Sequence, residues 1–211
     1  MVNDQMVNGK WYMVNDQMVN IFDIVSLCTE DEVQRMLPLV NAQRREQALR
    51  YKHTFGRFCC LKSWLMLREL YSGEMQFRYN EHGKPEWDNG PFFSISHCKT
   101  GIAVAVHDQP VGIDIETIRP VSEDLVLRTM NENEQKLIRE SEHPERVFTR
   151  LWTQKEAVVK CIGTGIESFE QLQNLLPSQL HVETFEKEKY IYSIAYGKLH
   201  CFGAQVPSAN V

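Results

Sequence analysis

The sequence predicts an α+β protein whose two halves have a similar outline, each with helices and a small antiparallel sheet. In the first half, apolar residues recur at helical spacing over 55–71, and strand-like runs follow at 92–96, 101–108 and 111–116. The second half again combines helices with strands near its end. Two pseudo-symmetric subdomains explain this repeat of element types better than one doubly wound sheet.

The chain of 211 residues is long enough for one large domain or two small ones with a real core. The octapeptide MVNDQMVN occurs at 1–8 and again at 13–20, which is too short for a solenoid repeat. We interpret residues 1–20 as a duplicated leader outside the fold. The remaining chain divides into an N-terminal subdomain (21–110) and a C-terminal subdomain (111–211).

The N-terminal subdomain is expected to begin with a strand at 21–27. The segment 30–50 is helical in character and is broken near Pro38. The helix at 55–71 is strongly amphipathic, and the turn at 82–85 (HGKP) precedes the three strand-like runs. The residues of this helix that we expect to face inward are Phe58, Leu61, Trp64 and Leu65.

In the C-terminal subdomain, Asn131 and Glu134 form an N-x-x-E helix start that is close to a capping box. A second helix is expected from about 144 to 161, where Gly163 ends it. The expected elements after this helix are a short helix at 168–176 and strands near 181–185, 189–196 and 199–206.

Composition excludes several classes of protein. The formal net charge is −5, whereas nucleic-acid-binding proteins usually have a basic excess. The sequence contains neither an apolar run long enough to span a membrane nor a secretory signal pattern. Its six cysteines have no zinc-like or disulfide-like spacing, so we expect a reduced, cytoplasmic protein.

The segment V-G-I-D-I-E (111–116) carries the strongest chemical signal. In a strand, Gly112, Asp114 and Glu116 would share one face, with the two carboxylates roughly 7 Å apart. This pair suits a hard divalent cation, and Gly112 would leave room for a ligand. The alternative is an edge strand with a solvated acidic face.

The segment W-T-Q-K-E-A-V-V-K (152–160) places Trp152, Glu156 and Lys160 on one helical stripe with Lys155 beside it. Glu156 would complete a metal site or accept a proton, and the lysines would hold phosphate oxygens. A surface ion pair between Glu156 and Lys160 is the alternative.

Two weaker signals lie upstream. His97 follows a strand and would hydrogen-bond a phosphate, unless it is only a capped turn residue. The basic run at 44–57 includes Arg57 and would grip phosphates, unless it is a solvated helix face.

Together and in this order, these segments resemble the 4′-phosphopantetheinyl transferase superfamily of the surfactin-synthetase-activating type. The family pattern G-[IV]-D-[IV]-E stands here at 112–116, and W-[ST]-x-K-E-[AS]-x-x-K stands at 152–160. Upstream, the family often has G-K-P, here at 83–85, and a strand ending in Ser-His, here at 96–97. The resemblance covers about residues 40–165 by motif.

The resemblance implies that Asp114, Glu116 and Glu156 bind Mg²⁺ together with the diphosphate of coenzyme A. It also implies that Glu156 accepts the proton of a serine hydroxyl while Lys160 assists the leaving group. Glu134 matches an acidic residue near the metal in some members, but its capping position competes with that role. The residues implied to contact coenzyme A are Arg57, Lys84, Ser96, His97, Lys155 and Lys160.

The activity implied is transfer of phosphopantetheine from coenzyme A to a serine of an apo acyl or peptidyl carrier protein. The length of the chain favours a monomer, with neither nucleic acid nor membrane as a partner. Two alternatives are a catalytically silent coenzyme A or nucleotide binding protein of the same fold and another Mg²⁺-dependent enzyme acting on phosphate esters.

Overall fold

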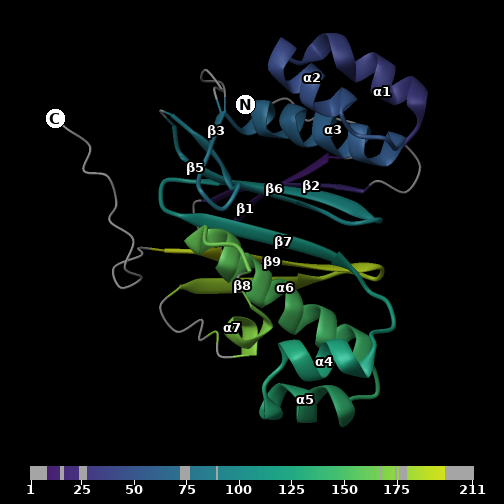
Figure 1. The fold of residues 1–211 in the computed structure, drawn as a ribbon, viewed down its shortest axis with the longest axis vertical. Coiled ribbons are helices and arrows are strands. Elements are labelled where there is room, and N and C mark those ends of the chain that lie inside the picture. Colours follow the sequence, from purple (N-terminus) through teal and green to yellow (C-terminus); the bar gives the residue numbers. More distant parts are fainter. Residues whose placement is uncertain are drawn as a thin grey trace, which may run out of the picture.

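A computed structural model of the chain stacks two antiparallel sheets on each other, with helices on both outer sides (Figure 1). Helix α3 lies on the first sheet with α1 and α2 packed against it, and α6 covers the second sheet. The α+β class predicted from the sequence is therefore confirmed. The residues that the structure describes are 9–14, 17–23, 28–71, 77–88, 90–166, 168–173, 175 and 180–197.

The first sheet has the strand order β1-β2-β6-β5, and all its pairs are antiparallel. Its strands are β1 (Gly9–Val14), β2 (Gln17–Asp23), β6 (Gly101–His107) and β5 (Phe92–His97). The expectation that residues 1–20 lie outside the fold is wrong for the described part of that segment. Backbone pairing of β2 with β6 draws it into the sheet, where Val19 and Asn20 are buried.

The helical layer on this sheet starts at a capped N-terminus, where the Thr29 side chain accepts a hydrogen bond from the Glu32 amide. The break near Pro38 is confirmed, because a short 3-10 turn, η1 (Leu37–Leu39), separates two helices. A two-stranded ribbon of β3 and β4 follows the layer. The bounds are α1 (Glu30–Met36), α2 (Ala42–Leu49), α3 (Thr54–Leu70), β3 (Phe77–Tyr79) and β4 (Pro85–Trp87).

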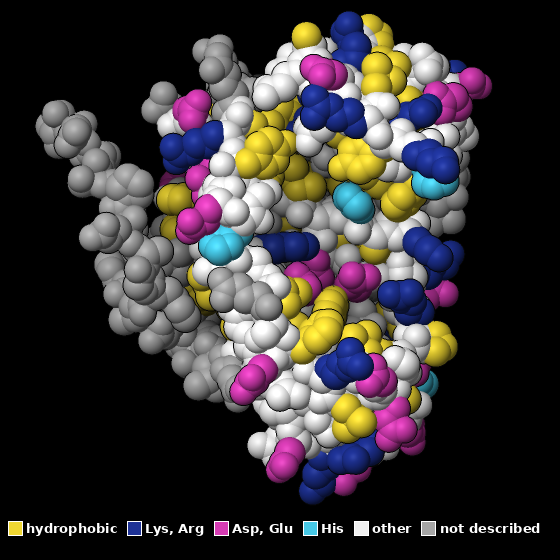
Figure 2. All heavy atoms as spheres, viewed as in Figure 1, with side chains coloured by type: hydrophobic (Ala, Val, Ile, Leu, Met, Phe, Trp, Pro, Cys, Tyr) yellow, Lys and Arg dark blue, Asp and Glu magenta, His cyan; other side chains and the backbone are white. Residues whose placement is uncertain are grey.

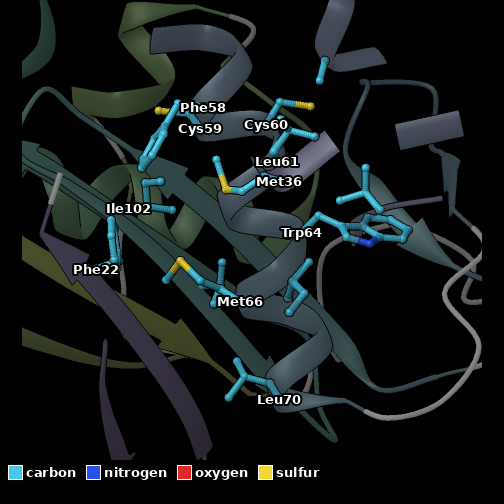
Figure 3. Close-up of a cluster of buried hydrophobic side chains, with 14 of the residues drawn as sticks. Phe22, Met36, Phe58, Cys59, Cys60, Leu61, Trp64, Met66, Leu70 and Ile102 are labelled. Atoms are coloured by element: carbon cyan, nitrogen blue, oxygen red, sulfur yellow. The ribbon is translucent and has the colours of Figure 1, made fainter. Parts of the chain in front are cut away.

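The larger core lies between α3 and the first sheet. Figure 3 shows the side chains of α3 gathered against Phe22 and Ile102 of the sheet. Phe58 and Trp64 are buried there as the helical period predicts, and both are 3% exposed or less. Leu65 is only partly buried and packs at the edge of this core.

Strand β6 is buried on both faces and so connects the two cores. Ile102 and Val104 point into the core under α3, whereas Ala103 and Ala105 face the second sheet. The small alanines allow close approach of the sheets, whose shared core includes Ile113 of the second sheet.

The second sheet has the order β7-β9-β8, again antiparallel. The helix predicted at 144–161 is confirmed, and Gly163 ends it in a left-handed conformation (φ 88°). The strand expected at 199–206 lies outside the described residues. The bounds are β7 (Val111–Thr117), α4 (Glu123–Thr129), α5 (Glu132–Arg139), α6 (Pro144–Ile162), α7 (Phe169–Gln173), β8 (His181–Glu186) and β9 (Tyr190–Tyr196).

Gln109 and Pro110 form the turn between β6 of the first sheet and β7 of the second. The division of the chain at this point into 21–110 and 111–211 stays a prediction. Within the described part of the chain, each helix is too short or too polar to cross a membrane.

Candidate functional site

The site is built where α6 crosses the outer face of β7. Alternation along β7 sends Ile113 and Ile115 into the core between the sheets and turns Asp114 towards α6. Ser193, opposite Asp114 on β9, lies 2.8 Å from the Thr153 hydroxyl of α6, which fixes the helix over this face.

Gly112 is the contact point between strand and helix. A Cβ atom at this position would lie 2.0 Å from the Ala157 carbonyl oxygen and 2.3 Å from the Cys161 amide nitrogen. The expectation that Gly112 leaves room for a ligand is therefore wrong, because the backbone of α6 occupies that space. This close approach holds Glu156 and Lys160 of α6 beside the carboxylates of β7.

Asp114 is the most deeply buried carboxylate of the site, at 3% exposed. Its Oδ1 accepts hydrogen bonds from Lys160 Nζ (2.6 Å) and Ser96 Oγ (2.8 Å), and Lys160 Nζ also donates to Ser96 Oγ (3.0 Å). Its Oδ2 is buried without a hydrogen-bond partner among the described residues. Because an unpaired buried carboxylate oxygen is costly, this atom is a candidate cation ligand.

Glu116 and Glu156 join Asp114 in one electrostatic cluster. Burial, followed by the charge of Asp114, raises the pKa of Glu116 to about 7. The same two causes raise the pKa of Glu156, and Lys160 opposes them. The surface ion pair considered for Glu156 and Lys160 is replaced by an ion pair between Lys160 and Asp114.

This cluster can supply part of a metal site. Among the described residues, no three His, Cys, Asp or Glu side chains converge closely enough to hold an ion by themselves. A hard divalent cation with a phosphate ligand needs only a few carboxylate oxygens, because phosphate and water fill its other positions. The free oxygen of Asp114 and the acidic side chains of Glu116 and Glu156 fit that requirement.

Two cavities follow each other along α6, and Glu156, which lines the first, lies one turn after Trp152, which lines the second. The first, which we call the Lys84 cavity, has a volume of about 360 Å³ and is lined by His82, Lys84, Phe93, Ile95, Glu156 and Lys160 among others. The second, the Trp152 cavity, has about 320 Å³, and its lining includes Glu116, Arg119, Val121, Leu125, Phe148 and Trp152. Trp152 and Lys160 are about 12 Å apart along the helix axis.

The Lys84 cavity contains an ammonium group whose hydrogen-bond acceptors are neutral. Lys84 Nζ approaches the carbonyl oxygens of Val111 (3.5 Å) and Cys161 (3.4 Å). Burial lowers the pKa of Lys84, so an anionic ligand would relieve the cost of its charge. Figure 2 shows basic, acidic and His side chains gathered in the recess between the α1–α3 half and the α4–α6 half.

The structure brings together most, but not all, of the residues singled out in the sequence. Ser96 is buried and reaches Asp114 and Lys160, whereas His97 is exposed at the end of β5 and contacts the ring of Phe55. Arg57 is engaged by the Tyr51 carbonyl (3.0 Å) and by Glu30 (3.4 Å), away from the lining of both cavities.

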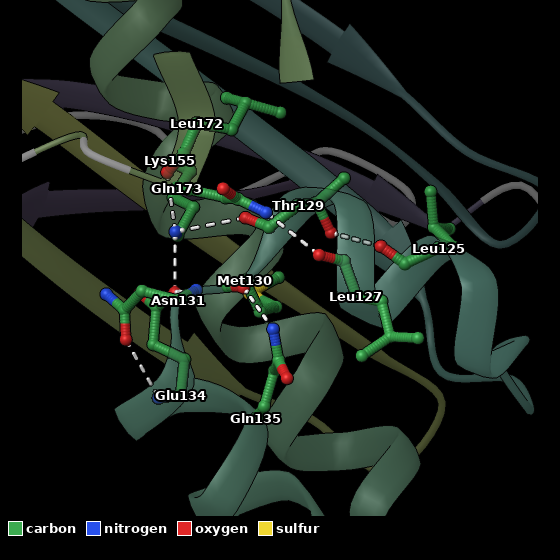
Figure 4. Close-up of polar contacts among 10 residues, drawn as sticks. All are labelled: Leu125, Leu127, Thr129, Met130, Asn131, Glu134, Gln135, Lys155, Leu172 and Gln173. Carbon is green, nitrogen blue, oxygen red and sulfur yellow. Dashed lines mark hydrogen bonds and ion pairs between the residues drawn. The ribbon is translucent and has the colours of Figure 1, made fainter. Parts of the chain in front are cut away.

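The expected role of Lys155 is not the one that the structure shows. The sequence suggested that it contacts phosphate, but its side chain leaves α6 on another face and is only 4% exposed. Its ammonium donates to Glu134 Oε2 at 2.7 Å (Figure 4). Because Glu134 makes this ion pair and also caps α5, it does not join the carboxylates of β7.

Sequence analysis missed two contributors. Ser94 Oγ accepts a hydrogen bond from the Ile113 amide (3.0 Å) and so joins β5 to β7 beneath the site. Arg119 lines the Trp152 cavity, and its charge partly offsets the rise in the pKa of Glu116 that burial and Asp114 cause. The position of Arg119 directly after the acidic strand was the available signal for it, whereas Ser94 gave none.

The pKa of Glu116 predicts how stability depends on pH in the absence of divalent cations. Because the folded state holds this proton up to about pH 7 while an ordinary Glu loses it near 4.5, the free energy of unfolding should fall as pH rises between these values. The full shift would correspond to about 3 kcal/mol. Because solvent screens this partly exposed carboxylate, we expect a loss on the order of 2 kcal/mol. Urea unfolding in EDTA at several pH values measures this loss. If the free energy of unfolding of Glu116→Gln fell equally steeply with pH, the raised pKa would not belong to Glu116.

Comparison with known proteins identifies one family. Residues 110–204 match the family model described as the 4′-phosphopantetheinyl transferase superfamily. The 4′-phosphopantetheinyl transferase AcpT of Salmonella typhi is 36% identical over 132 residues, which are 57% of this chain and 68% of the relative.

Two further relatives carry the same activity in their names. The 4′-phosphopantetheinyl transferase Sfp of Bacillus subtilis (strain 168) is 28% identical over 149 residues, covering 65% of this chain and 66% of Sfp. The 4′-phosphopantetheinyl transferase gsp of Aneurinibacillus migulanus is 32% identical over 118 residues, covering 55% of this chain and 50% of gsp. The matched regions thus span less than two thirds of the length of these two relatives.

Proposed function

Because the chain belongs to the 4′-phosphopantetheinyl transferase superfamily, we propose that it transfers 4′-phosphopantetheine from coenzyme A to a serine hydroxyl of an apo carrier protein and releases 3′,5′-ADP. The observation that carries the proposal is the buried Asp114, whose Oδ2 is free while Lys160 holds its Oδ1. Its neighbour Lys160 lines the Lys84 cavity, and Glu116 of the same strand lines the Trp152 cavity.

Mg²⁺ is the cation that we assign to this site, held by Asp114, Glu116 and Glu156. When bound, it neutralises charge on the diphosphate and makes the phosphorus easier to attack. The residues of the chain supply positioning. Lys160 lies where it can stabilise charge on a phosphate oxygen and on the leaving 3′,5′-ADP.

Glu156 is the proposed general base. A serine hydroxyl is a weak nucleophile until a base removes its proton. Burial and the charge of Asp114 raise the pKa of Glu156, which strengthens it as a base near neutral pH. The proton thus moves from the serine oxygen to the Glu156 carboxylate as the new phosphoester bond forms.

The two cavities provide opposite approaches to the reacting phosphorus. Attacking and leaving oxygens lie roughly in line in phosphoryl transfer. We assign coenzyme A to the Lys84 cavity, where Lys84 and Lys160 supply positive charge. Ser96 and His97 adjoin this side, and Arg57 stays a proposed contact to the 3′-phosphate. The acceptor segment of the carrier then enters from the Trp152 cavity, next to Glu116.

We further propose that the protein acts as a cytoplasmic monomer. The cysteines that the structure describes are free thiols, which fits a reducing compartment. Its partners are then coenzyme A and an apo acyl or peptidyl carrier protein.

Incubation with coenzyme A, Mg²⁺ and an apo carrier protein should convert the carrier to a form heavier by one phosphopantetheine, as intact-mass spectrometry would detect. EDTA should stop the conversion, and added Mg²⁺ should restore it, because the carboxylates cannot align the diphosphate alone. Binding of coenzyme A without any mass change, across a panel of acyl and peptidyl carriers, would favour the silent binding protein. Hydrolysis of phosphate esters without transfer would favour another phosphoester enzyme.

A further inference from the structure

The most completely engaged ammonium among the described residues lies outside the proposed reaction site. Lys155 of α6 donates to Leu172 O (2.6 Å), Glu134 Oε2 (2.7 Å) and Thr129 O (3.2 Å). These acceptors belong to α7, α5 and the C-terminal end of α4, so one ammonium joins α6 to three other helices (Figure 4). Its three protons match three acceptors, which leaves none for a phosphate.

Glu134 makes two contacts with one carboxylate oxygen. Its Oε2 accepts a hydrogen bond from the backbone amide of Asn131 (2.8 Å) as well as one from Lys155. In return, Asn131 Oδ1 accepts a hydrogen bond from the backbone amide of Glu134 (3.0 Å). The capping box that starts α5 is therefore fixed directly to the ammonium of α6.

A hydrogen-bonded path leads from Lys155 to the Trp152 cavity. Lys155 holds the Thr129 carbonyl, and Thr129 Oγ1 donates to the Leu125 carbonyl (2.7 Å) one turn earlier in α4. Leu125 lines the Trp152 cavity, opposite Phe148 and Trp152 of α6. Leu125 and Val126 of α4 also pack against Phe148 and Trp152 of α6 in one apolar cluster. Lys155 thus holds the C-terminal end of α4, and the Trp152 cavity lies beside the start of the same helix.

Stability alone does not account for this arrangement. Removing an ammonium from water costs free energy, and an apolar side chain of similar size often serves the fold as well as a buried ion pair. An apolar side chain, however, makes no directional hydrogen bonds. Three hydrogen bonds to three separate elements fix the orientation of α4, α5 and α7 on α6 in a way that packing leaves looser.

We propose that Lys155 is a positioning residue for the acceptor side of the site, acting through Thr129 and Leu125 on the cavity that receives the carrier protein. This inference rests on the proposed function. We expect the coenzyme A side to be unaffected, because the Lys84 cavity is built from the turn before β4, from β4 and β5, and from the later turns of α6 and the segment that follows them.

Steady-state kinetics of Lys155→Met test the proposal. We expect the KM for the apo carrier protein to rise about tenfold, since small displacements far from the reacting atoms can cost up to about a hundredfold, while the KM for coenzyme A stays unchanged. Lys155→Arg should recover part of the loss. Lys136→Met is the matched control, because Lys136 lies on the exposed face of α5, and we expect wild-type kinetics from it.

Glu134→Gln keeps the test decisive if Lys155→Met fails to fold. A glutamine preserves the shape and the capping acceptor but removes the charge that holds Lys155. We expect the same selective rise in the KM for the carrier. Unchanged KM values in folded variants would overturn the proposal. Equal rises in the KM for the carrier and in the KM for coenzyme A would also overturn it and would favour a phosphate-binding role for Lys155.

Hydrogen exchange separates this inference from the proposed function. In Lys155→Met, amides of α4 and of the first turn of α5 should exchange faster, while those of β7 keep their protection. If the wild-type protein transferred no phosphopantetheine but α4 loosened in this way, the proposed function would fail and the coupling of Lys155 to α4 would stand. Unchanged exchange of α4 in a folded variant would overturn the coupling itself.

Discussion

Asp114→Ala is expected to abolish phosphopantetheine transfer, with a loss of about a thousandfold or more. The variant loses the oxygen that is free to bind a cation and also the acceptor that holds Lys160 in place. Single-turnover transfer to an apo carrier, followed by intact-mass spectrometry, measures the loss.

The fold should survive this change. The Asp114 side chain is buried with one oxygen unpaired, which is a cost to the folded state, and the Lys160 side chain is 30% exposed and can be solvated. Asp124→Ala is the control, since Asp124 is an exposed residue of α4 that pairs with Arg128 on the same helix. Near-normal transfer by Asp114→Ala would refute the metal assignment.

Gly112→Ala should be the most destabilising single methyl addition at the site, by about 3 kcal/mol or more. The new Cβ would meet backbone atoms of α6, and a backbone cannot move aside as the end of a side chain can. Separation of α6 from β7 would also draw Glu156 away from Asp114, so transfer should fall with stability. Urea unfolding and the transfer assay measure the two effects.

Gly83→Ala is the control that distinguishes a steric clash from backbone strain as the cause of lost stability. Gly83 has φ 81°, and the methyl group of an alanine there would meet no described atom within 4 Å. We expect the substitution to cost only about 1 kcal/mol, from its left-handed conformation. Equal effects of the two substitutions would show that α6 does not approach Gly112 closely enough to exclude a methyl group.

Local periodicity was enough to predict the acidic strand and the basic helix. The alternation in 111–116 placed Asp114 on one face of β7, and the helical spacing in 152–160 placed Glu156 and Lys160 on one stripe. Both patterns are properties of a few neighbouring residues, so they hold whatever surrounds them. The Asn131 cap and the Gly163 end of α6 were predictable for the same reason.

Contacts between distant segments decided the rest. Lys155 stands next to Glu156 in the sequence, but a step of one residue along a helix turns the side chain by about 100°. Lys155 therefore points to another face of α6, and the packing of α4, α5 and α7 determined which groups it meets there. The space beside Gly112 is filled by the α6 backbone rather than by a ligand. Thr153 of α6 bonds to Ser193 of β9, the strand paired with β7, and so a segment distant in the sequence helps to hold the helix against Gly112.

The sequence by itself determined the class of fold, and it singled out the residues that we propose for the chemistry, because both follow from short-range periodicity and residue type. Only the tertiary structure decided which lysine faces Asp114 and which supports the helices, and that residues 9–14 and 17–20 belong to the first sheet. Pairing of β2 with β6 joins segments some eighty residues apart. Its hydrogen bonds are made by backbone groups, which every sequence has, and so the residue types do not reveal it.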